Sequence, residues 1–139
     1  MTRTVVVAVD WSPVSKRAVE FGGEIARAMN ARIVLLHVRA PAGRPAGAAG
    51  PMADVQEGEG LERLAKEWSS RLQSSGVADV KAIFLEGPPV DALLGYVEAH
   101  PPDLLVFGRR GHSSGARMLL GGVTSSVLQH ATCPLLVVP

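Results

Sequence analysis

The sequence has little of what several common classes of small protein require. It contains a single cysteine, Cys133, so no disulfide can form within the chain. Only 4% of the residues are aromatic, too few for the stacking platforms of single-stranded nucleic-acid binders. With 14 Lys and Arg against 13 Asp and Glu, no excess of positive charge attracts nucleic acid. The first apolar run, residues 5–9, is too short for a signal peptide or a membrane span. These absences predict a cytoplasmic protein that binds neither nucleic acid nor a membrane.

Length and apolar content predict one domain over residues 1–139. Since 47% of the residues are apolar, the chain can build a core without metal or disulfide cross-links. Residues 40–53 are the exception, because they consist mainly of Ala, Gly and Pro and lack apolar periodicity. Their composition is typical of a flexible loop. A mobile spacer is favoured over a lid that covers a ligand.

Five short apolar runs predict the strands of a parallel sheet. They are continuous rather than alternating and rich in Val, Leu and Ile, which is typical of strands covered on both faces. The runs are residues 5–9, 33–38, 80–85, 104–107 and 135–138.

Helical periodicity fills each interval between these runs. Ser12 and Pro13 supply an N-cap and a first-turn proline for the first helix. Apolar residues spaced three and four apart predict the buried faces. The inward residues are predicted to be Val14, Ala18, Phe21, Ile25 and Met29, then Leu61, Leu64, Trp68 and Leu72, then Leu93, Leu94 and Val97, and finally Val123, Val127 and His130 or Leu128.

Strict alternation of strands and helices predicts a three-layer α/β sandwich with right-handed crossovers. The expected sheet is five-stranded and parallel, in the order 3-2-1-4-5. Such a sheet binds ligands where the strand order reverses, here at the carboxyl ends of the first and fourth strands. The segments expected there are residues 10–13 and the chain from Gly108 onward.

Glycines gather in the segment that follows the fourth strand. Gly108 ends that strand, Gly111 follows in the turn, and Gly121 and Gly122 precede the last helix. Glycine permits close backbone approach, and a helix N-terminus adds unpaired N–H groups, so the segment predicts phosphate binding. The glycine spacing alone is weak support, and its place between a strand and a helix strengthens it. Additional candidate contacts are the cationic or protonatable Arg109, Arg110 and His112, unless they are simply solvated, and the hydroxyls of Thr124 and Ser125.

Two other nucleotide signatures are missing. No Gly-Lys dipeptide occurs, which excludes a P-loop, and residues 10–13 contain no glycine, which excludes the dinucleotide fingerprint of Rossmann enzymes.

Further motifs stand in residues 7–12, 35–38, 86–88, 103–108 and 133–138. Through these motifs and the Gly-x2-Gly-x9-Gly segment, the whole chain resembles the universal stress protein family. The resemblance implies an adenine nucleotide alpha hydrolase-like fold, with ATP as ligand, accompanied by Mg²⁺ or Mn²⁺. It also implies a homodimer, formed by antiparallel pairing of residues 135–138 from two chains.

The resemblance also assigns roles to individual residues. Asp10 is expected near the ribose or a phosphate-bound metal, with a helix cap as the alternative, and Val38 is expected to meet the adenine through its backbone. Gly122 stands where the family pattern has Ser or Thr, so one side-chain donor is missing. The full predicted nucleotide site comprises Ala8, Val9, Asp10, Val38, Gly108, Arg109, Gly111, His112, Gly121, Gly122, Val123 and Thr124.

The favoured function is that of an ATP-binding sensor or regulator in the stress response. Only Asp10 and His112 are expected near the phosphates as possible bases, so no catalytic residue is predicted. The alternatives are a dimeric interaction module with a vestigial site, a slow ATP hydrolase or autophosphorylating protein, and a nucleotide-dependent hydrolase or transferase.

Four remaining residues are predicted to be structural. His37 and Trp68 are expected to pack, as is Trp11, for which a place at the border of the pocket is the alternative. Cys133 is expected to act as a small buried apolar residue.

Overall fold

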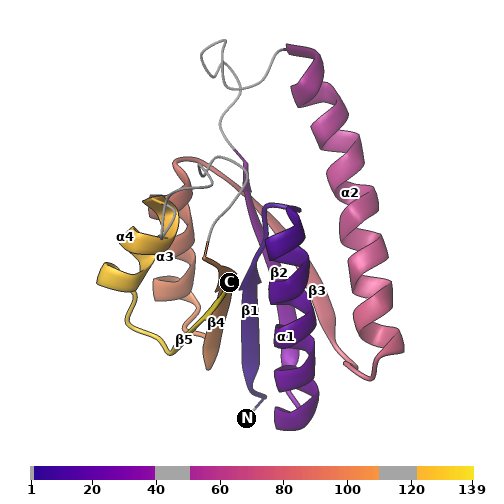
Figure 1. The fold of residues 1–139 in the computed structure, drawn as a ribbon, viewed down its shortest axis with the longest axis vertical. Coiled ribbons are helices and arrows are strands. Elements are labelled where there is room, and N and C mark those ends of the chain that lie inside the picture. Colours follow the sequence, from indigo (N-terminus) through magenta and orange to yellow (C-terminus); the bar gives the residue numbers. More distant parts are fainter. Residues whose placement is uncertain (1, 40–50, 110–121) are drawn as a thin grey trace.

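The computed structural model describes residues 2–39, 51–109 and 122–139, which form a parallel sheet between two layers of helices (Figure 1). The strands lie in the order β3-β2-β1-β4-β5. This arrangement confirms the predicted three-layer sandwich. The elements are β1 (Thr4–Ala8), α1 (Pro13–Met29), β2 (Arg32–Arg39), α2 (Pro51–Ser74), β3 (Val80–Glu86), α3 (Pro89–Ala99), β4 (Leu104–Gly108), α4 (Gly122–His130) and β5 (Leu135–Val138).

Each face of the sheet buries its own apolar core. Val5 and Val7 of β1 belong to the cluster that includes residues of α1 and α2. Val6 of the same strand points to the opposite face, where it joins a cluster with residues of α3 and α4. Because both faces of the central strands are covered, their sequences are continuous apolar runs.

Helix α1 packs closely on the sheet because its inner face is made mainly of small residues. Its buried residues are Ser15, Ala18, Val19, Gly22, Gly23 and Ala26. The prediction that Phe21 faces inward is wrong, since its side chain is 48% exposed. The three- and four-residue spacing of the large apolar side chains misplaced the buried face of α1. The residues that pack on the sheet are mainly small ones, and the larger side chains lie beside them.

Helix α2 begins at Pro51, so residues 51–53 are helical rather than part of a loop. The remainder of the expected loop, residues 40–50, lies outside the described residues. Farther along α2, Leu61, Trp68 and Leu72 are buried as predicted. None of the helices in the described parts of the chain combines the length and the apolar character that crossing a bilayer requires.

Helix α4 buries fewer of its predicted residues. Val127 is fully buried, but Val123 and Leu128 are about two-fifths exposed, at 40% and 41%, and His130 is exposed as well. The buried residue that the apolar pattern missed is Thr124. Its polar side chain is buried because it has a hydrogen-bond partner, described below.

The close packing of α1 predicts that Gly22→Ala destabilises the protein. An added Cβ would lie 2.7 Å from Cγ2 of Val7, closer than two carbon atoms can approach without a shift. We expect a loss of about 1–3 kcal/mol in the free energy of unfolding, measured by urea denaturation.

Gly95→Ala in α3 is the matched control. Its added Cβ meets nothing within 4 Å, so the better helix propensity of Ala should leave stability unchanged or slightly higher. Equal stability of the Gly22→Ala variant and the wild type would contradict the close contact.

Candidate functional site

The sheet has a topological switch point between β1 and β4. These strands are neighbours, with Val5 paired to Leu104 and Val7 to Val106. The chain leaves β1 for α1 on one face, and α4, which follows β4 in the chain, packs on the opposite face. Open α/β sheets bind ligands at the carboxyl ends of strands that diverge in this way. Residues 10–13 follow β1 at this place, and Gly108 and Arg109 lie at the end of β4, whereas residues 110–121 of the second predicted segment lie outside the described residues.

Hydrogen bonds among Asp10, Ser12 and Ser15 shape the turn between β1 and α1. The Ser12 backbone N–H donates to Oδ1 of Asp10 over 3.0 Å, and the Asp10 N–H donates to Oγ of Ser15 over 3.0 Å. Oγ of Ser12 accepts from the Ser15 N–H at 3.2 Å, which confirms Ser12 as the N-cap of α1. Ser12 and Ser15 are both buried. Asp10 therefore has a structural role in the turn, whatever else it binds.

Trp11 packs under α2, as predicted. Its ring lies 4.9 Å from that of Trp68 in an edge-to-face arrangement and 5.6 Å from the His37 imidazole. The backbone of Trp11 is left-handed, with φ of 65°. This feature of the turn could not be read from the sequence, because Trp has no preference for that conformation.

His37 is anchored at the end of β2. Its Nδ1 lies 2.7 Å from the backbone carbonyl oxygen of Val9. Since a carbonyl oxygen can only accept, Nδ1 carries the hydrogen and donates. The prediction of a packed histidine is confirmed by this bond and by its ring contacts with Trp11 and Phe84.

The residues expected to meet the adenosine lie at neighbouring strand ends. The Val9 N–H donates to the Leu36 carbonyl over 2.8 Å, which extends the β1–β2 ladder by one residue beyond β1. Ala8 and Val38 both pack against the cluster on the α3 and α4 side of the sheet. Ala8 and Val38 thus share one face of the sheet near its carboxyl edge, whereas the side chain of Val9, which precedes Asp10, is buried on the opposite face.

The end of β4 and the start of α4 are joined by one side chain. Oγ1 of Thr124 donates to the carbonyl oxygen of Gly108 over 3.0 Å, and Thr124 is only 4% exposed. The structure thus brings two predicted site residues together across a sequence separation of 16. In this arrangement the hydroxyl hydrogen of Thr124 is already engaged, so its predicted role as a donor to phosphate is not available.

Arg109 brings a positive charge to the same strand end. Its backbone N–H continues the ladder by donating to the Val138 carbonyl over 2.8 Å. Its side-chain Nε is buried and has no hydrogen-bond partner among the residues that the structure describes. A buried guanidinium N–H without an acceptor is costly, and an anion would satisfy it.

Four residues of the glycine segment, Arg110, Gly111, His112 and Gly121, lie outside the described residues. Gly122 is exposed at the first position of α4, and an added Cβ there would meet nothing within 4 Å. Packing against the described part of the chain therefore does not explain why glycine replaces Ser or Thr. Val123, the next predicted contact, is 40% exposed.

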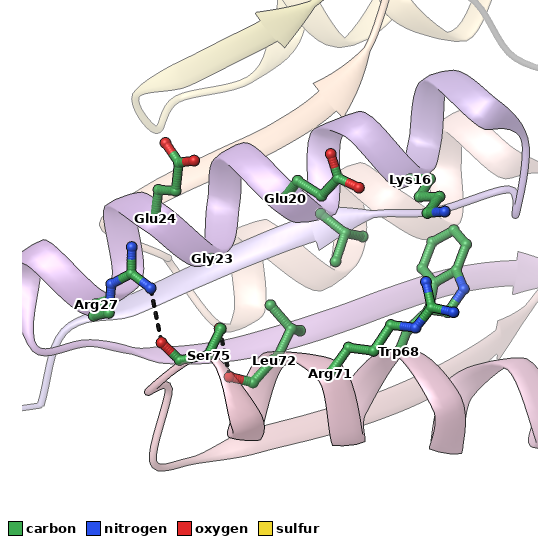
Figure 2. Close-up of a pocket in the computed structure, with 10 residues that line it drawn as sticks. Lys16, Glu20, Gly23, Glu24, Arg27, Trp68, Arg71, Leu72 and Ser75 are labelled. Carbon is green, nitrogen blue, oxygen red and sulfur yellow. Dashed lines mark hydrogen bonds between the residues drawn. The ribbon is translucent and has the colours of Figure 1, made fainter.

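A separate cavity of about 240 Å³ lies between α1 and α2 (Figure 2). Val19, Gly23, Trp68 and Leu72 contribute its apolar part, and charged side chains such as Arg71 stand at its margin. Sequence reasoning missed this cavity because its walls come from two helices that are distant in the chain. It lies along the α1–α2 contact and shares no lining residue with the predicted nucleotide site.

The described residues give little support for a metal site or for a reactive cysteine. Within residues 2–39, 51–109 and 122–139, no group of three His, Cys, Asp or Glu side chains could hold a metal ion. Cys133 is half-buried, and its burial raises the pKa of the thiol above the ordinary value. A raised pKa lowers the thiolate fraction at neutral pH, which disfavours redox chemistry at this residue.

The Thr124 contact predicts that Thr124→Val destabilises the protein. Valine has the same shape but leaves the Gly108 carbonyl oxygen without this partner, which costs about 1–3 kcal/mol. Thermal unfolding should show a lower Tm for Thr124→Val than for Thr124→Ser, which retains the hydroxyl. The same Tm in both variants would mean that the hydrogen bond does not join α4 to β4.

Comparison with known proteins identifies the family. The family model described as the Universal stress protein family matches residues 1–139. A universal stress protein of Thermus aquaticus is 30% identical over 138 residues, which cover 99% of each chain. One of Mycobacterium tuberculosis is 32% identical over 140 residues, covering 98% of this chain and 95% of its own.

Solved structures agree with this result. A universal stress protein crystallised in complex with cAMP is 32% identical, with a TM-score of 0.70 and coverage of 99% of this chain and 96% of its own. The universal stress protein UspA from Lactobacillus plantarum has the same fold, with a TM-score of 0.87 at 24% identity and coverage of 99% and 97%. The chain therefore belongs to the universal stress protein family.

Proposed function

We propose that this protein binds an adenine nucleotide, ATP in particular, at the carboxyl ends of β1 and β4, and acts as a sensor or regulator in the cytoplasmic stress response. The observation that carries the proposal is the buried Nε of Arg109 at the switch point, which has no hydrogen-bond partner among the described residues. The relative that binds cAMP supports an adenine nucleotide as the class of ligand, since it is 32% identical and shares the fold.

The phosphates have two kinds of donor in this proposal. The guanidinium of Arg109 supplies positive charge, and the first turn of α4, which begins at the exposed Gly122, supplies backbone N–H groups without intrahelical partners. Gly108, Gly111, His112 and Gly121 complete this part by their match to the family pattern. Thr124 contributes by fixing the start of α4 against Gly108 rather than by touching phosphate.

The adenosine is assigned to the strand ends on the other side of the switch point. Ala8 and Val38 offer partly buried apolar surface there, as expected for a purine base and its ribose. Val9 supports this edge from within, because its side chain is buried on the opposite face and its backbone groups bond to Leu36 and His37. Asp10 adds a carboxylate at the same edge. Mg²⁺ or Mn²⁺ prefers carboxylate and phosphate oxygens, so Asp10 is the residue of this set that would approach a nucleotide-bound metal.

A regulatory role fits the chemistry better than rapid catalysis. Fast phosphoryl transfer requires a metal clamp and a residue that positions the attacking group. Asp10, a candidate for that task, already accepts a hydrogen bond from the Ser12 N–H. Slow hydrolysis remains the alternative, and loss of hydrolysis in Asp10→Ala at unchanged affinity would favour it.

Nucleotide binding should raise the thermal stability. At 100 times its dissociation constant, a ligand that binds only the folded state adds about 2.7 kcal/mol. We expect millimolar ATP to raise the Tm by several degrees in a thermal-shift assay. The Gly121→Val variant should fold but show no shift, because the added side chain would block the phosphate segment.

The absence of any shift with ATP, ADP, AMP or cAMP would favour the alternative of an interaction module with a vestigial site. An unchanged shift in Gly121→Val would contradict the assignment of the phosphates to the glycine segment.

The last strand supports self-association. β5 lies at one edge of the sheet, and its Leu135, Leu136 and Val137 are only partly buried. The carbonyls of Pro134 and Val138 accept hydrogen bonds from Leu105 and Arg109 of the β4 side. Backbone groups alternate along a strand, so Leu135 and Val137 direct theirs outward. An apolar edge with outward-facing donors and acceptors favours pairing with a second copy.

Proline at an outward position should therefore prevent dimerisation. Val137→Pro removes an outward N–H while leaving the β4–β5 ladder intact. Light scattering at micromolar concentration should give the mass of a dimer for the wild type and of a monomer for Val137→Pro.

Ala82→Pro provides a matched control on the opposite edge. The Ile33 N–H donates to the Asp79 carbonyl, and the Gly87 N–H donates to the Arg39 carbonyl, so the backbone groups of odd-numbered residues along β3 point toward β2. The backbone groups of Ala82 therefore point outward. This variant should remain dimeric. A monomeric wild type, or a dimeric Val137→Pro variant, would contradict pairing through β5.

A further inference from the structure

Trp11 adopts a backbone conformation that its side chain disfavours. Its φ of 65° lies in the left-handed region, which costs a residue with a Cβ atom free energy and which bulky residues rarely occupy. Among the described residues, the other non-glycine with positive φ is Asn30, which caps the C-terminus of α1. Asn tolerates this conformation and is common at helix ends. Trp11 has no such local explanation.

The indole of Trp11 is held by ring packing. The ring of Trp68 lies 4.9 Å away and that of His37 lies 5.6 Å away. Trp68 is only 7% exposed, and His37 is fixed in turn by its bond to the Val9 carbonyl. The indole Nε1 is buried without a hydrogen-bond partner in the described part of the chain. Contact with Trp68 and His37 must therefore offset both the backbone strain and the unsatisfied N–H.

The strained residue stands inside the turn that presents Asp10. The bond from the Ser12 N–H to Oδ1 of Asp10 spans Trp11 and closes the turn around it. Ser12 also caps α1 through Oγ. If Trp11 relaxed to negative φ, the direction of the chain between Asp10 and Ser12 would change, and this bond would break. The rotation of one backbone angle thus controls where the Asp10 carboxylate lies.

We propose that Trp68 of α2 holds Trp11 in its left-handed conformation and thereby keeps the Asp10 turn ready for nucleotide. Trp11 and Trp68 are positioning residues in this scheme, which rests on the nucleotide site proposed above. The turn has two arrangements, and nucleotide binds the strained one. By linkage, whatever moves Trp68 on α2 changes nucleotide affinity, and bound nucleotide fixes Trp68 against Trp11 to the same extent.

A cycle of substitutions tests this proposal through ATP affinity, measured by isothermal titration. Trp68→Leu retains a buried apolar side chain but removes the ring that packs on Trp11. Relaxation of the turn should weaken ATP binding by up to roughly 5- to 30-fold, the factor that corresponds to the cost of a left-handed non-glycine residue. In the Trp11→Gly background, glycine takes the same φ without penalty, so Trp68→Leu should change affinity by less than about twofold.

The test compares the effect of Trp68→Leu on ATP affinity in the wild type with its effect in the Trp11→Gly variant. Weaker binding with Trp11 present, together with little change in Trp11→Gly, supports the proposal. An equal loss of affinity in both backgrounds would assign Trp68 a general structural role instead. No loss in either background would separate Trp68 from the site altogether, and both results overturn the proposal.

Hydrogen exchange in the nucleotide-free protein gives a second readout that does not depend on the proposed function. The Ser12 amide should lose protection in Trp68→Leu and keep it in the double variant Trp11→Gly, Trp68→Leu. If the wild type bound no adenine nucleotide, the proposed function would fail while this exchange test still applied. Unchanged protection in Trp68→Leu, or equal loss in both variants, would overturn the positioning role.

Discussion

The carboxyl edge of the sheet depends on the close contact between α1 and β1. Gly22 of the helix faces Val7 of the strand with no room for a further carbon atom, and Ala18 and Ala26 continue the small-residue face. The helix also begins soon after the strand ends, with Ala8 the last residue of β1 and Pro13 the first of α1. The chain has four residues, 9–12, in which to reverse direction.

The tightness of this connection explains the features found in it. The chain reverses direction within these four residues, one of which is the left-handed Trp11. The polar groups of so short a turn cannot all reach solvent, so Asp10, Ser12 and Ser15 bond to one another. Strain at one residue is offset by aromatic packing against α2, so the turn depends on contacts with two helices.

Most of the fold could be predicted from the sequence because the signal was strong and local. Continuous Val, Leu and Ile runs predict buried parallel strands, and the strand order and alternation are confirmed. The inner face of α1 could not be predicted in the same way. Apolar periodicity weighs large side chains such as Phe21, whereas small residues allow the closest approach, so the helix is rotated from its expected position.

The candidate site was predictable in outline but not in its bonds. The glycine spacing and the predicted strand ends placed Gly108 and Thr124 in one site, and in the structure a hydrogen bond joins these two residues. That the Thr124 hydroxyl is engaged by a backbone carbonyl is a matter of tertiary geometry, to which residue type gives no clue. The conformation of Trp11 is a second such case, since the sequence identified a packing residue but carried no sign of its positive φ.

The two edges of the sheet differ in a way that bears on how large an assembly can grow. β5 is wholly apolar, whereas β3 at the far edge exposes the charged side chains of Lys81 and Glu86. Charged side chains discourage strand addition. If two chains join through β5 about a two-fold axis, both β5 edges are paired, and the remaining β3 edges carry Lys81 and Glu86 beside the partly exposed Phe84. Growth would then stop at ten strands by symmetry, so pairing through β5 would also protect the protein from forming fibres.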